Sequence, residues 1–586
     1  MEIDEFQGQL ITADNAEYDT ARAVWNGAID RYPRLIARCS GAADVATAVR
    51  FAREHDLEIA VRGGGHNVAG TAVCDDGIVI DLTAMRAVRV DLDSGTVQVQ
   101  GGALWGDVDH AAQAHGLTTT GGIVSHTGVA GLTLGGGIGW LMRKHGLTVD
   151  NLLAADVVTA DGELLRASDD QHPDLFWALR GGGGNFGVVT SFEFQLHPVG
   201  PDVLAGPIVW DASDTGEVLH FYRDFVRNAP DELGTVVRFG TAPPLPVIPE
   251  ELHWRPVLLV GACYAGPVED GDEVLRPLRA FGRPLLDLIG PTPYVNHQSA
   301  LDSTVLHAWN YYWKSTYLPE LRDDLIDVIA ENAFACSSPR SYAVMFHLGG
   351  AVSRVPEAAT AFGNRQASHA ITLDGVWRSG EDYADRDIAW TRRFFAALDS
   401  YREGVYVNFL GADEDPDRIR DAYCTAAEAS TKMSSAPRSP RPSPITWRSG
   451  GMKGCGGAGT RRRECLASAI FPASSLKETR IVSSLFHGPD GHCARAVQEC
   501  ARRAGTTPIR QHRRGSLTSF PSRGTIQRIP LPEVRRNTGA RDGSRSGCFV
   551  DNRYERLGAA GVLTILLPND ESLKTGDLSR IAISGC

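Results

Sequence analysis

Several common features are missing from this sequence of 586 residues. No apolar run reaches the roughly 20 residues that cross a bilayer. The acidic start, MEIDEFQGQL, lacks the basic and apolar regions of a signal peptide. Neither a G-x-x-x-x-G-K loop nor a C-x-x-C pair occurs, which excludes a P-loop and the usual zinc spacing. We therefore predict a cytoplasmic protein with no membrane partner and no metal site.

Lysine is almost absent from residues 1–423, which contain only Lys144 and Lys314. These residues hold 32 basic and 59 acidic side chains, whereas residues 424–586 hold 26 basic and 12 acidic ones. A body this acidic repels nucleic acid, so we exclude nucleic acid as a partner. An excess of carboxylates over lysine also suggests a halophile-like origin, in which dense acidic groups keep the surface hydrated.

The composition changes abruptly near Tyr423, and residues 424–586 become rich in Arg, Ser, Pro, Gly and Cys. Little of this basic tail shows helical or strand periodicity, so we interpret it as irregular, either disordered or translated out of frame. A basic arm that binds a polyanion is an alternative interpretation.

The body before this tail alternates short helices with short strands bounded by glycine or aspartate, which predicts an α+β fold. The expected helices are Gly41–His55, Trp105–Ala114, His172–Leu179 and Glu217–Arg227. The expected strands are Glu58–Val61, Gly77–Leu82, Val88–Asp91, Thr96–Val99, Leu153–Thr159, Leu164–Ala167, Val188–Leu196, Val257–Ala262, Ser341–Val352 and Gly404–Leu410.

Three glycine clusters lie within this body. The cluster at 182–187 matches G-x-G-x-x-G, but a helix precedes it and a strand follows, the reverse of a Rossmann fingerprint. Glycines without a helix can still expose successive backbone N–H groups to an anion. Several such loops together could hold a pyrophosphate without any lysine.

Three motifs resemble one enzyme family: RGGGHNVAG from Arg62, GGIVSHTGVAGLTLGGGIGWL from Gly121, and DLFWALRGGGGNFGVVTSFEFQLHP from Asp174. They are similar to the FAD-linked oxidases of the vanillyl-alcohol-oxidase and p-cresol-methylhydroxylase (PCMH) superfamily, in the berberine-bridge-enzyme-like branch and near 6-hydroxynicotine-oxidase-like members. The resemblance implies a PCMH-type FAD-binding domain of two α+β subdomains at 1–200. A substrate domain with an antiparallel sheet would follow at 201–423, and the tail is 424–586.

The resemblance also implies cofactor-binding residues. His66 corresponds to the histidine that bonds covalently to the flavin 8α-methyl group, and Val124 stands where some relatives have a second, cysteinyl link, so a single histidyl link is expected. The stretches that would line FAD contain Arg62, Gly63, Gly64, Gly65, His66, Asn67, Gly122, Ser125, His126, Gly128, Gly131, Gly135, Asp150, Asn151, Gly187 and Val189.

Catalytic candidates lie further along the chain. Such enzymes pass a hydride from a carbon bearing O or N to flavin N5, so the protein must supply a base and orient the substrate. Tyr406 is a candidate base if its pKa is lowered, and His347 is another because histidine titrates near neutrality. Asn408, on the expected return strand Gly404–Leu410, could anchor the substrate or the flavin. For each residue, a role in the core is the alternative.

We therefore expect an FAD-dependent oxidoreductase acting on a small alcohol, sugar or amine, with O₂ or another acceptor reoxidising the flavin. The alternative is a non-catalytic or inactive flavin-binding protein, because the chain departs from the family after Tyr423.

Overall fold

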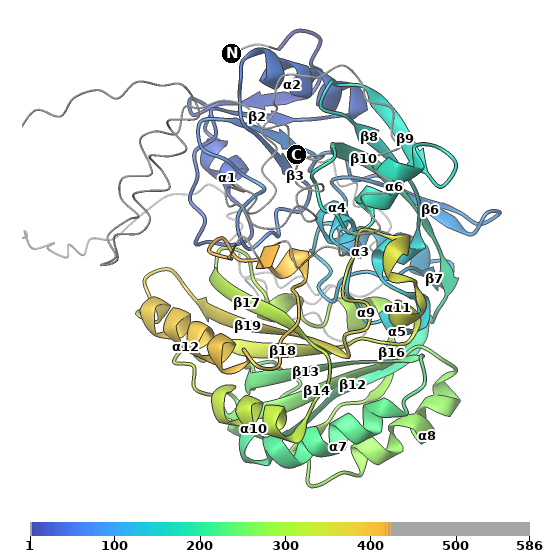
Figure 1. Cartoon of the computed structure of the whole chain (residues 1–586), viewed down its shortest axis with the longest axis vertical. Coiled ribbons are helices and arrows are strands. Elements are labelled where there is room, and N and C mark those ends of the chain that lie inside the picture. The colour runs from blue at the N-terminus through green and yellow to red at the C-terminus, as the bar shows by residue number, and fades with distance from the viewer. Residues whose placement is uncertain (1–2, 416–417, 420–421, 423–586) are drawn as a thin grey trace, which may run out of the picture. The chain divides into compact units, whose positions relative to one another are not determined.

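The computed structural model describes residues 3–415, 418–419 and 422, so the predicted basic tail lies outside the described residues. Three large sheets and one of two strands organise this part of the chain (Figure 1). The mixture of helices and sheets confirms the predicted α+β class.

The first sheet has the strand order β1 (Gln9–Ile11), β2 (Leu35–Arg38), β4 (Ile78–Asp81) and β3 (Ile59–Arg62). Its β2, β4 and β3 strands run parallel, and helix α2 (Ala42–Glu54) connects β2 to β3. Val45 and Val49, on the apolar side of α2, pack against this sheet and are fully buried. The first glycine cluster follows directly after the end of β3 at Arg62.

The second sheet is antiparallel throughout, in the order β5 (Val88–Asp91), β6 (Thr96–Gln100), β10 (Val188–Gln195), β8 (Leu152–Val158) and β9 (Leu164–Ser168). Helices α3 (Trp105–Gln113) and α6 (Pro173–Leu179) bury Trp105 and Phe176 in its core. The short helix α4 (Val129–Leu134) lies within the middle glycine run, and helix α5 (Met142–His145) and turn η1 (Thr148–Asn151) follow it. Strand β7 (Leu117–Thr118) pairs with β11 (His197–Pro198).

The third sheet has eight antiparallel strands. Its order is β15 (Leu286–Asp287), β12 (Asp202–Asp211), β14 (Pro256–Tyr264), β13 (Leu233–Thr241), β18 (Tyr342–His347), β19 (His369–Trp377) and β17 (Asn310–Leu318), with β16 (Gly290–Pro293) also paired to β12. This arrangement agrees with the antiparallel sheet expected after residue 200, although the predicted domain boundaries remain a prediction.

Four helices cover one face of this third sheet, namely α7 (Thr215–Arg227), α8 (Val268–Arg279), α10 (Asp323–Asn332) and α12 (Ala384–Ala397) (Figure 1). Side chains that alternate along a strand point to opposite faces. On β18, Ala343 and Met345 accordingly enter the helix-covered core, whereas Val344 and Phe346 pack toward residues 138–149 of the glycine-rich half. The inner face of the sheet thus faces the glycine clusters.

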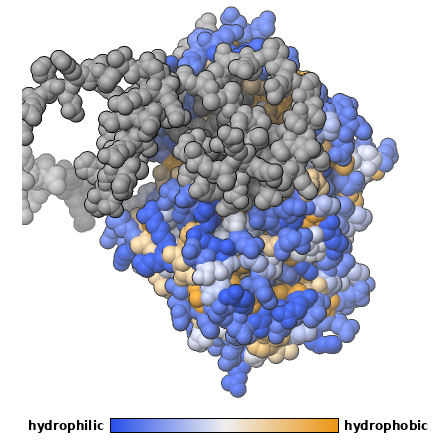
Figure 2. Space-filling view, in the orientation of Figure 1, coloured by the Kyte–Doolittle hydropathy of each residue, from blue (hydrophilic) through white to orange (hydrophobic). Residues whose placement is uncertain are grey.

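The remaining short elements are α1 (Tyr18–Arg22), α9 (Tyr294–Gln298), α11 (Ala351–Arg354), and the 3₁₀ turns η2 (Ala212–Asp214), η3 (Glu250–Leu252), η4 (Asp302–Thr304), η5 (Glu357–Ala359) and η6 (Val407–Phe409). Among the described residues, none of the helices is long and apolar enough to span a membrane. Hydrophilic residues dominate the described part of the face drawn in Figure 2.

The predicted return strand Gly404–Leu410 is wrong. Only Glu403 pairs with the third sheet, in an isolated bridge to Tyr317, and the chain then leaves the sheet edge. The backbone N–H of Phe409 donates to the carbonyl of Tyr406, which closes the η6 turn. The segment turns because its polar side chains bond to the middle glycine run rather than following β17.

Candidate functional site

A cavity of about 360 Å³ lies where the glycine clusters meet the inner face of the third sheet. The loop Gly63–Asn67, parts of 122–134 and parts of 183–189 line it from the glycine-rich half. Strands β13, β17, β18 and β19 and the segment Tyr406–Leu410 supply much of the remaining wall, to which Trp25 and parts of 301–305 also contribute. Segments that are distant in sequence therefore form one site.

The loop after β3 presents unpaired backbone amides to this cavity. Within the described part of the chain, the N–H groups of Gly63 to Asn67 donate no hydrogen bond. Gly65 adopts a φ of +68°, a conformation that favours glycine. Successive N–H groups in such a turn form an anion-binding nest. The loop is therefore suited to a phosphate or pyrophosphate group.

The other glycines leave room for a ligand. A Cβ atom added at Gly131 or Gly184 would meet no atom within 4 Å, and both residues line the cavity. A Cβ at Gly64 would instead lie 2.5 Å from the Cα of Gly128, because the first and second clusters approach each other closely there. Asn185 adds a buried side-chain oxygen, Oδ1, without a hydrogen-bond partner in the described chain. This glycine-lined space with an anion nest fits a flavin nucleotide.

The predicted cofactor residues divide into two groups in the structure. The cavity is lined by Gly63, Gly64, Gly65, His66, Asn67, Gly122, Gly128, Gly131, Gly187 and Val189. Outside its lining lie Arg62, Ser125, His126, Gly135, Asp150 and Asn151. Most side chains of the second group form hydrogen bonds to neighbouring segments and do not reach the cavity. They therefore hold in place the residues that line it.

Arg62 illustrates this supporting role. Its Nη2 atom lies 2.6 Å from Oδ2 of the fully buried Asp81, and its Nη1 donates to the Ala21 carbonyl. Asn151 donates to the carbonyls of His145 and Leu147. These side chains fix the backbone on either side of the site and are turned away from the cavity.

Asp150 and Gly135 connect the glycine-rich half to later segments. The carboxylate of Asp150 accepts two hydrogen bonds from Arg365, whose side chain is fully buried, with an Nη2–Oδ1 distance of 2.8 Å. A Cβ at Gly135 would lie 2.2 Å from Oδ1 of Asn408, so only glycine allows the return segment to approach.

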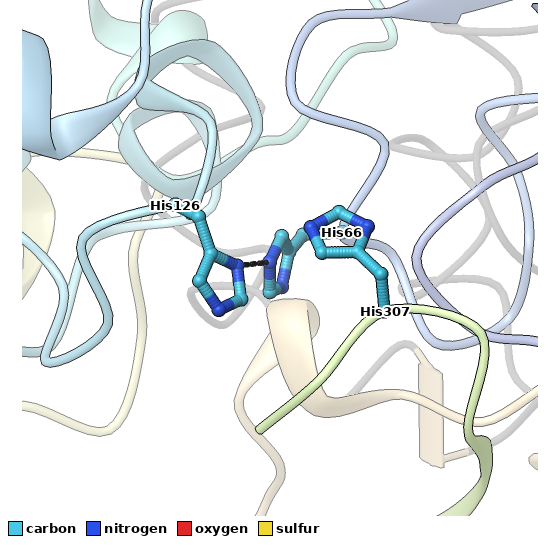
Figure 3. Close-up of side chains that lie close together, drawn as sticks. All are labelled: His66, His126 and His307. Carbon is cyan, nitrogen blue, oxygen red and sulfur yellow. Dashed lines mark hydrogen bonds between the residues drawn. The ribbon is translucent and has the colours of Figure 1, made fainter. Parts of the chain in front are cut away.

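His66 lines the cavity, and its ring lies beside those of His126 and His307 (Figure 3). Its Nε2 atom is 2.7 Å from Nδ1 of His126, and its ring stacks on Trp25 at a centroid distance of 4.7 Å. Burial, with His126 and His307 as neighbours, holds the pKa of His66 well below its usual value. His66 is therefore a neutral imidazole that can act as a nucleophile.

One nitrogen from each of these three histidines lies within 4.8 Å of the others. Such a group is able to share a metal ion, a possibility that the sequence motifs did not indicate. The spacing of these residues in the sequence does not indicate such a site, because the three histidines come from three distant segments.

Tyr406 and Asn408 both line the cavity. The Tyr406 hydroxyl accepts hydrogen bonds of 2.8 Å from the Gly137 amide and from Nδ2 of Asn408, and that Nδ2 also donates to the Leu132 carbonyl. Burial raises the pKa of Tyr406 despite these donors, so the condition for its role as a base, a lowered pKa, is not met. The two side chains hold the return segment against the middle glycine run.

His347 lies outside the cavity. It is the third residue of the alternating set Ala343, Met345, His347 on β18, which faces away from the cavity, and its Nε2 lies 3.1 Å from Nη1 of Arg143. Burial, together with His369 and Arg143, holds the pKa of His347 well below its usual value. This geometry gives no support to the predicted role of His347 as a catalytic base.

Sequence reasoning missed a polar group on the sheet wall, Asp374. Its carboxylate is buried and lines the cavity; Oδ2 accepts a hydrogen bond of 3.1 Å from Thr372, and Oδ1 has no partner in the described chain. Burial raises its pKa well above the usual value. The sequence feature that could have indicated Asp374 is its position as a lone carboxylate inside the apolar stretch HAITLDGVW.

Aromatic residues flank Asp374 on both sides. In the sheet register it pairs with Tyr342 on β18 and with Trp313 on β17, and both also line the cavity. The buried Nε1 of Trp313 has no hydrogen-bond partner in the described chain. Arg238 lies over the Tyr342 ring at 4.7 Å. This wall offers both a donor and an acceptor to a small molecule between aromatic rings.

Comparison with known proteins agrees with this geometry. Residues 33–168 match the FAD binding domain family. An FAD-linked oxidoreductase of Dictyostelium discoideum is 33% identical over 411 residues, which cover 69% of this chain and 87% of that protein. The (R)-6-hydroxynicotine oxidase of Paenarthrobacter nicotinovorans is 37% identical over 290 residues, 49% of this chain and 61% of that protein.

Solved structures show the same fold. The 6-hydroxy-D-nicotine oxidase of Arthrobacter nicotinovorans superposes with a TM-score of 0.64 at 28% identity, covering 73% of this chain and 93% of that one. A berberine-bridge-enzyme-like protein of Physcomitrella patens gives a TM-score of 0.65 at 22% identity, with the same coverage. The fold and the site together define a PCMH-type flavoprotein. The chain belongs to the family of FAD-linked oxidoreductases.

Proposed function

We propose that this enzyme oxidises a carbon bearing oxygen or nitrogen in a small alcohol, sugar or amine, with O₂ or another acceptor taking the electrons. The observation that carries this proposal is the unpartnered carboxylate oxygen of Asp374 on the sheet wall of the glycine-lined cavity. The similarity to a protein named 6-hydroxynicotine oxidase supports an amine within this range.

FAD, when bound, supplies the acceptor for a hydride from the substrate carbon. The amides of Gly63 to Asn67 would hold its pyrophosphate, and Gly131 and Gly184 would allow it to approach the backbone. We propose a single covalent link from His66, whose ring is neutral and lines the cavity.

Asp374 would accept the O–H or N–H proton of the substrate. Thr372 binds only one carboxylate oxygen, so Oδ1 remains available to a ligand. Burial raises the pKa of Asp374, whereas the positive charge of Arg238, which also lines the cavity, lowers it and favours the ionised form that a base needs. Trp313 and Tyr342, on either side, would contact the apolar part of the substrate.

The return segment would position these groups rather than exchange protons. Tyr406 and Asn408 connect η6 to Gly137 and Leu132, which brings the segment to the cavity wall. We therefore propose that Tyr406 and Asn408 orient the site.

The test is anaerobic reduction of the bound flavin by a panel of alcohols, sugars and amines, in the full chain and in Asp374→Asn. Bleaching of the flavin absorbance by at least one substrate is expected, with reduction about 10²–10⁴-fold slower in the variant, the usual contribution of a general base. Asp374→Glu retains a carboxylate and is the control. If no substrate bleaches the wild-type flavin, the oxidoreductase activity proposed for this chain is wrong.

A further inference from the structure

Arg238, on β13, brings a positive charge to the sheet wall of the cavity. Its sequence neighbours Val237 and Phe239 enter the helix-covered core, so the alternation of the strand turns Arg238 to the inner face. Its Nη1 donates to the carbonyl of Thr241 at 3.0 Å, and within the described part of the chain the guanidinium forms no ion pair. Since a guanidinium has five N–H donors, several of them remain available to a ligand.

This lack of a carboxylate partner sets Arg238 apart from the arginines that the fold buries. Arg62, Arg143 and Arg365 are buried, and each forms an ion pair with an aspartate. Burial also lowers the pKa of Arg238, which shows that water solvates its charge incompletely. Because a guanidinium keeps its charge at physiological pH, Arg238 favours an anion in the cavity.

A group of opposite charge, Asp374, lies on the far side of one aromatic ring from Arg238. The guanidinium carbon of Arg238 is 4.7 Å from the centre of the Tyr342 ring, and Tyr342 is paired with Asp374 in the register of β18 and β19. Strand β18 separates β13 from β19, so the two backbones are roughly 10 Å apart. The cavity wall therefore offers a cation at one point and the unpartnered Oδ1 of Asp374 at another.

A molecule that bridges these two groups needs an anionic end and an end that carries an O–H or N–H proton. A carboxylate suits Arg238, because its two oxygens can accept two parallel hydrogen bonds from a guanidinium. The aromatic rings of Tyr342 and Trp313, which flank Asp374, can contact an apolar linker between the ends. Residues 1–423 hold 59 acidic and 32 basic side chains, so an anion gains from this local positive charge in a chain that otherwise repels it.

We propose that Arg238 binds a carboxylate of the substrate, and that the substrate is therefore an organic acid that also carries the alcohol or amine to be oxidised. The inference rests on the proposed function, in which Asp374 accepts the proton of that alcohol or amine. It assigns Arg238 as the specificity-determining residue that selects hydroxy acids and amino acids over uncharged compounds of the same shape.

Matched pairs of compounds test the charge. 4-(Hydroxymethyl)benzoate and 4-(aminomethyl)benzoate place a ring between the two functional groups, whereas mandelate places them on adjacent carbons. The corresponding primary amides have nearly the same shape without the charge. In the FAD-loaded wild type, we expect the preferred acid to reduce the flavin with a second-order rate constant about 10–100-fold higher than its amide does, the usual contribution of a charged hydrogen bond.

Substitutions at position 238 separate the charge from the shape of the guanidinium. Arg238→Gln removes the charge, and Arg238→Lys keeps it without the planar pair of donors. Arg378→Gln is the matched control, because Arg378 is an exposed residue just after β19 that does not line the cavity, and its loss changes the net charge equally. We expect the ratio of the acid and amide rate constants to fall close to 1 in Arg238→Gln, to an intermediate value in Arg238→Lys, and to stay unchanged in Arg378→Gln.

This ratio distinguishes substrate recognition from a general effect on Asp374. The charge of Arg238 favours the ionised form of Asp374, so Arg238→Gln also slows the reduction by the amide. A role limited to Asp374 slows the acid and the amide equally and leaves their ratio unchanged, which would refute the proposal. So would an Arg238→Gln chain that keeps the wild-type circular dichroism spectrum but no longer binds FAD, because Arg238 would then hold the cofactor.

A binding measurement that needs no oxidation completes the test. Isothermal titration of the FAD-loaded chain with benzoate and with benzamide should show binding about tenfold or more tighter for benzoate, and this preference should disappear in Arg238→Gln. Equal binding of the two compounds by the wild type would refute the anion site, whether or not the variants fold.

The two proposals fail differently. If sugars or uncharged alcohols and amines reduce the wild-type flavin and no acid exceeds its amide, the role of Arg238 is wrong and the oxidoreductase activity stands. If no compound of the whole panel reduces the flavin while benzoate binding depends on Arg238, the proposed oxidation is wrong and the anion site stands.

Discussion

The ion pair between Asp150 and Arg365 joins the glycine-rich half to the segment before β19, and its removal has a predictable cost. The guanidinium is fully buried and lies 2.8 and 3.1 Å from the two carboxylate oxygens. Its other acceptors are the hydroxyl of Thr360 and the carbonyl of Val352, both neutral. Asp150→Asn therefore leaves a buried positive charge without its counter-ion.

Breaking one partner of a buried ion pair typically costs about 3–5 kcal/mol. We expect this loss in the free energy of unfolding of Asp150→Asn, measured by urea denaturation followed by far-UV circular dichroism. Asp19→Asn is the control: Asp19 is 81% exposed, Arg22 keeps Asp30 as a partner, and the expected loss is below about 1 kcal/mol. A loss for Asp150→Asn no larger than that of the control would refute the reasoning.

Three further predictions concern the cavity and its supports. Gly131→Ala should lower the ratio of bound FAD to protein without unfolding the chain, because its Cβ atom enters the cavity. Gly41→Ala is the control: its Cβ atom is equally unhindered but lies outside the cavity lining, so the ratio of bound FAD to protein should not change. Tyr406→Phe leaves the Gly137 amide unpaired and should cost about 1–3 kcal/mol in urea denaturation, with flavin reduction slowed less than about tenfold. Burial raises the pKa of Asp109 to about 7, so the wild type should lose stability relative to Asp109→Asn as the pH rises from about 4 to about 7. Urea midpoints measured across this range should show the difference between the two chains becoming independent of pH below about pH 4.

The local residue pattern was sufficient to predict most of the helices and strands in the glycine-rich half. The helix at α2 and the strands at β5 and β10 were predicted within about two residues, because apolar spacing and glycine boundaries act over a few positions. The loop Gly63–Asn67 could likewise be predicted to have free backbone amides, because glycines in a turn leave them unhindered; its role in binding an anion stays a prediction.

Residues whose roles depend on the opposite face of a sheet could not be assigned. His347 and Phe346 are neighbours in sequence, yet only Phe346 lines the cavity, because the register of β18 decides which of them turns inward. Asp374 escaped notice for the same reason: its strand reads as ordinary core until Tyr342 and Trp313 are placed beside it.

The bonds that close the cavity have a consequence for the order of biosynthesis. Tyr406 reaches the Gly137 amide across 269 residues, and Asn408 reaches the Leu132 carbonyl across 276. Contacts of such high sequence separation form late, because the intervening chain must be organised first. The loop Gly63–Asn67 is made early during translation, but the wall that closes the cavity requires nearly the whole described chain. We therefore expect cofactor capture to be a late event in maturation, because a nascent chain arrested before residue 406 has the loop without an enclosed site.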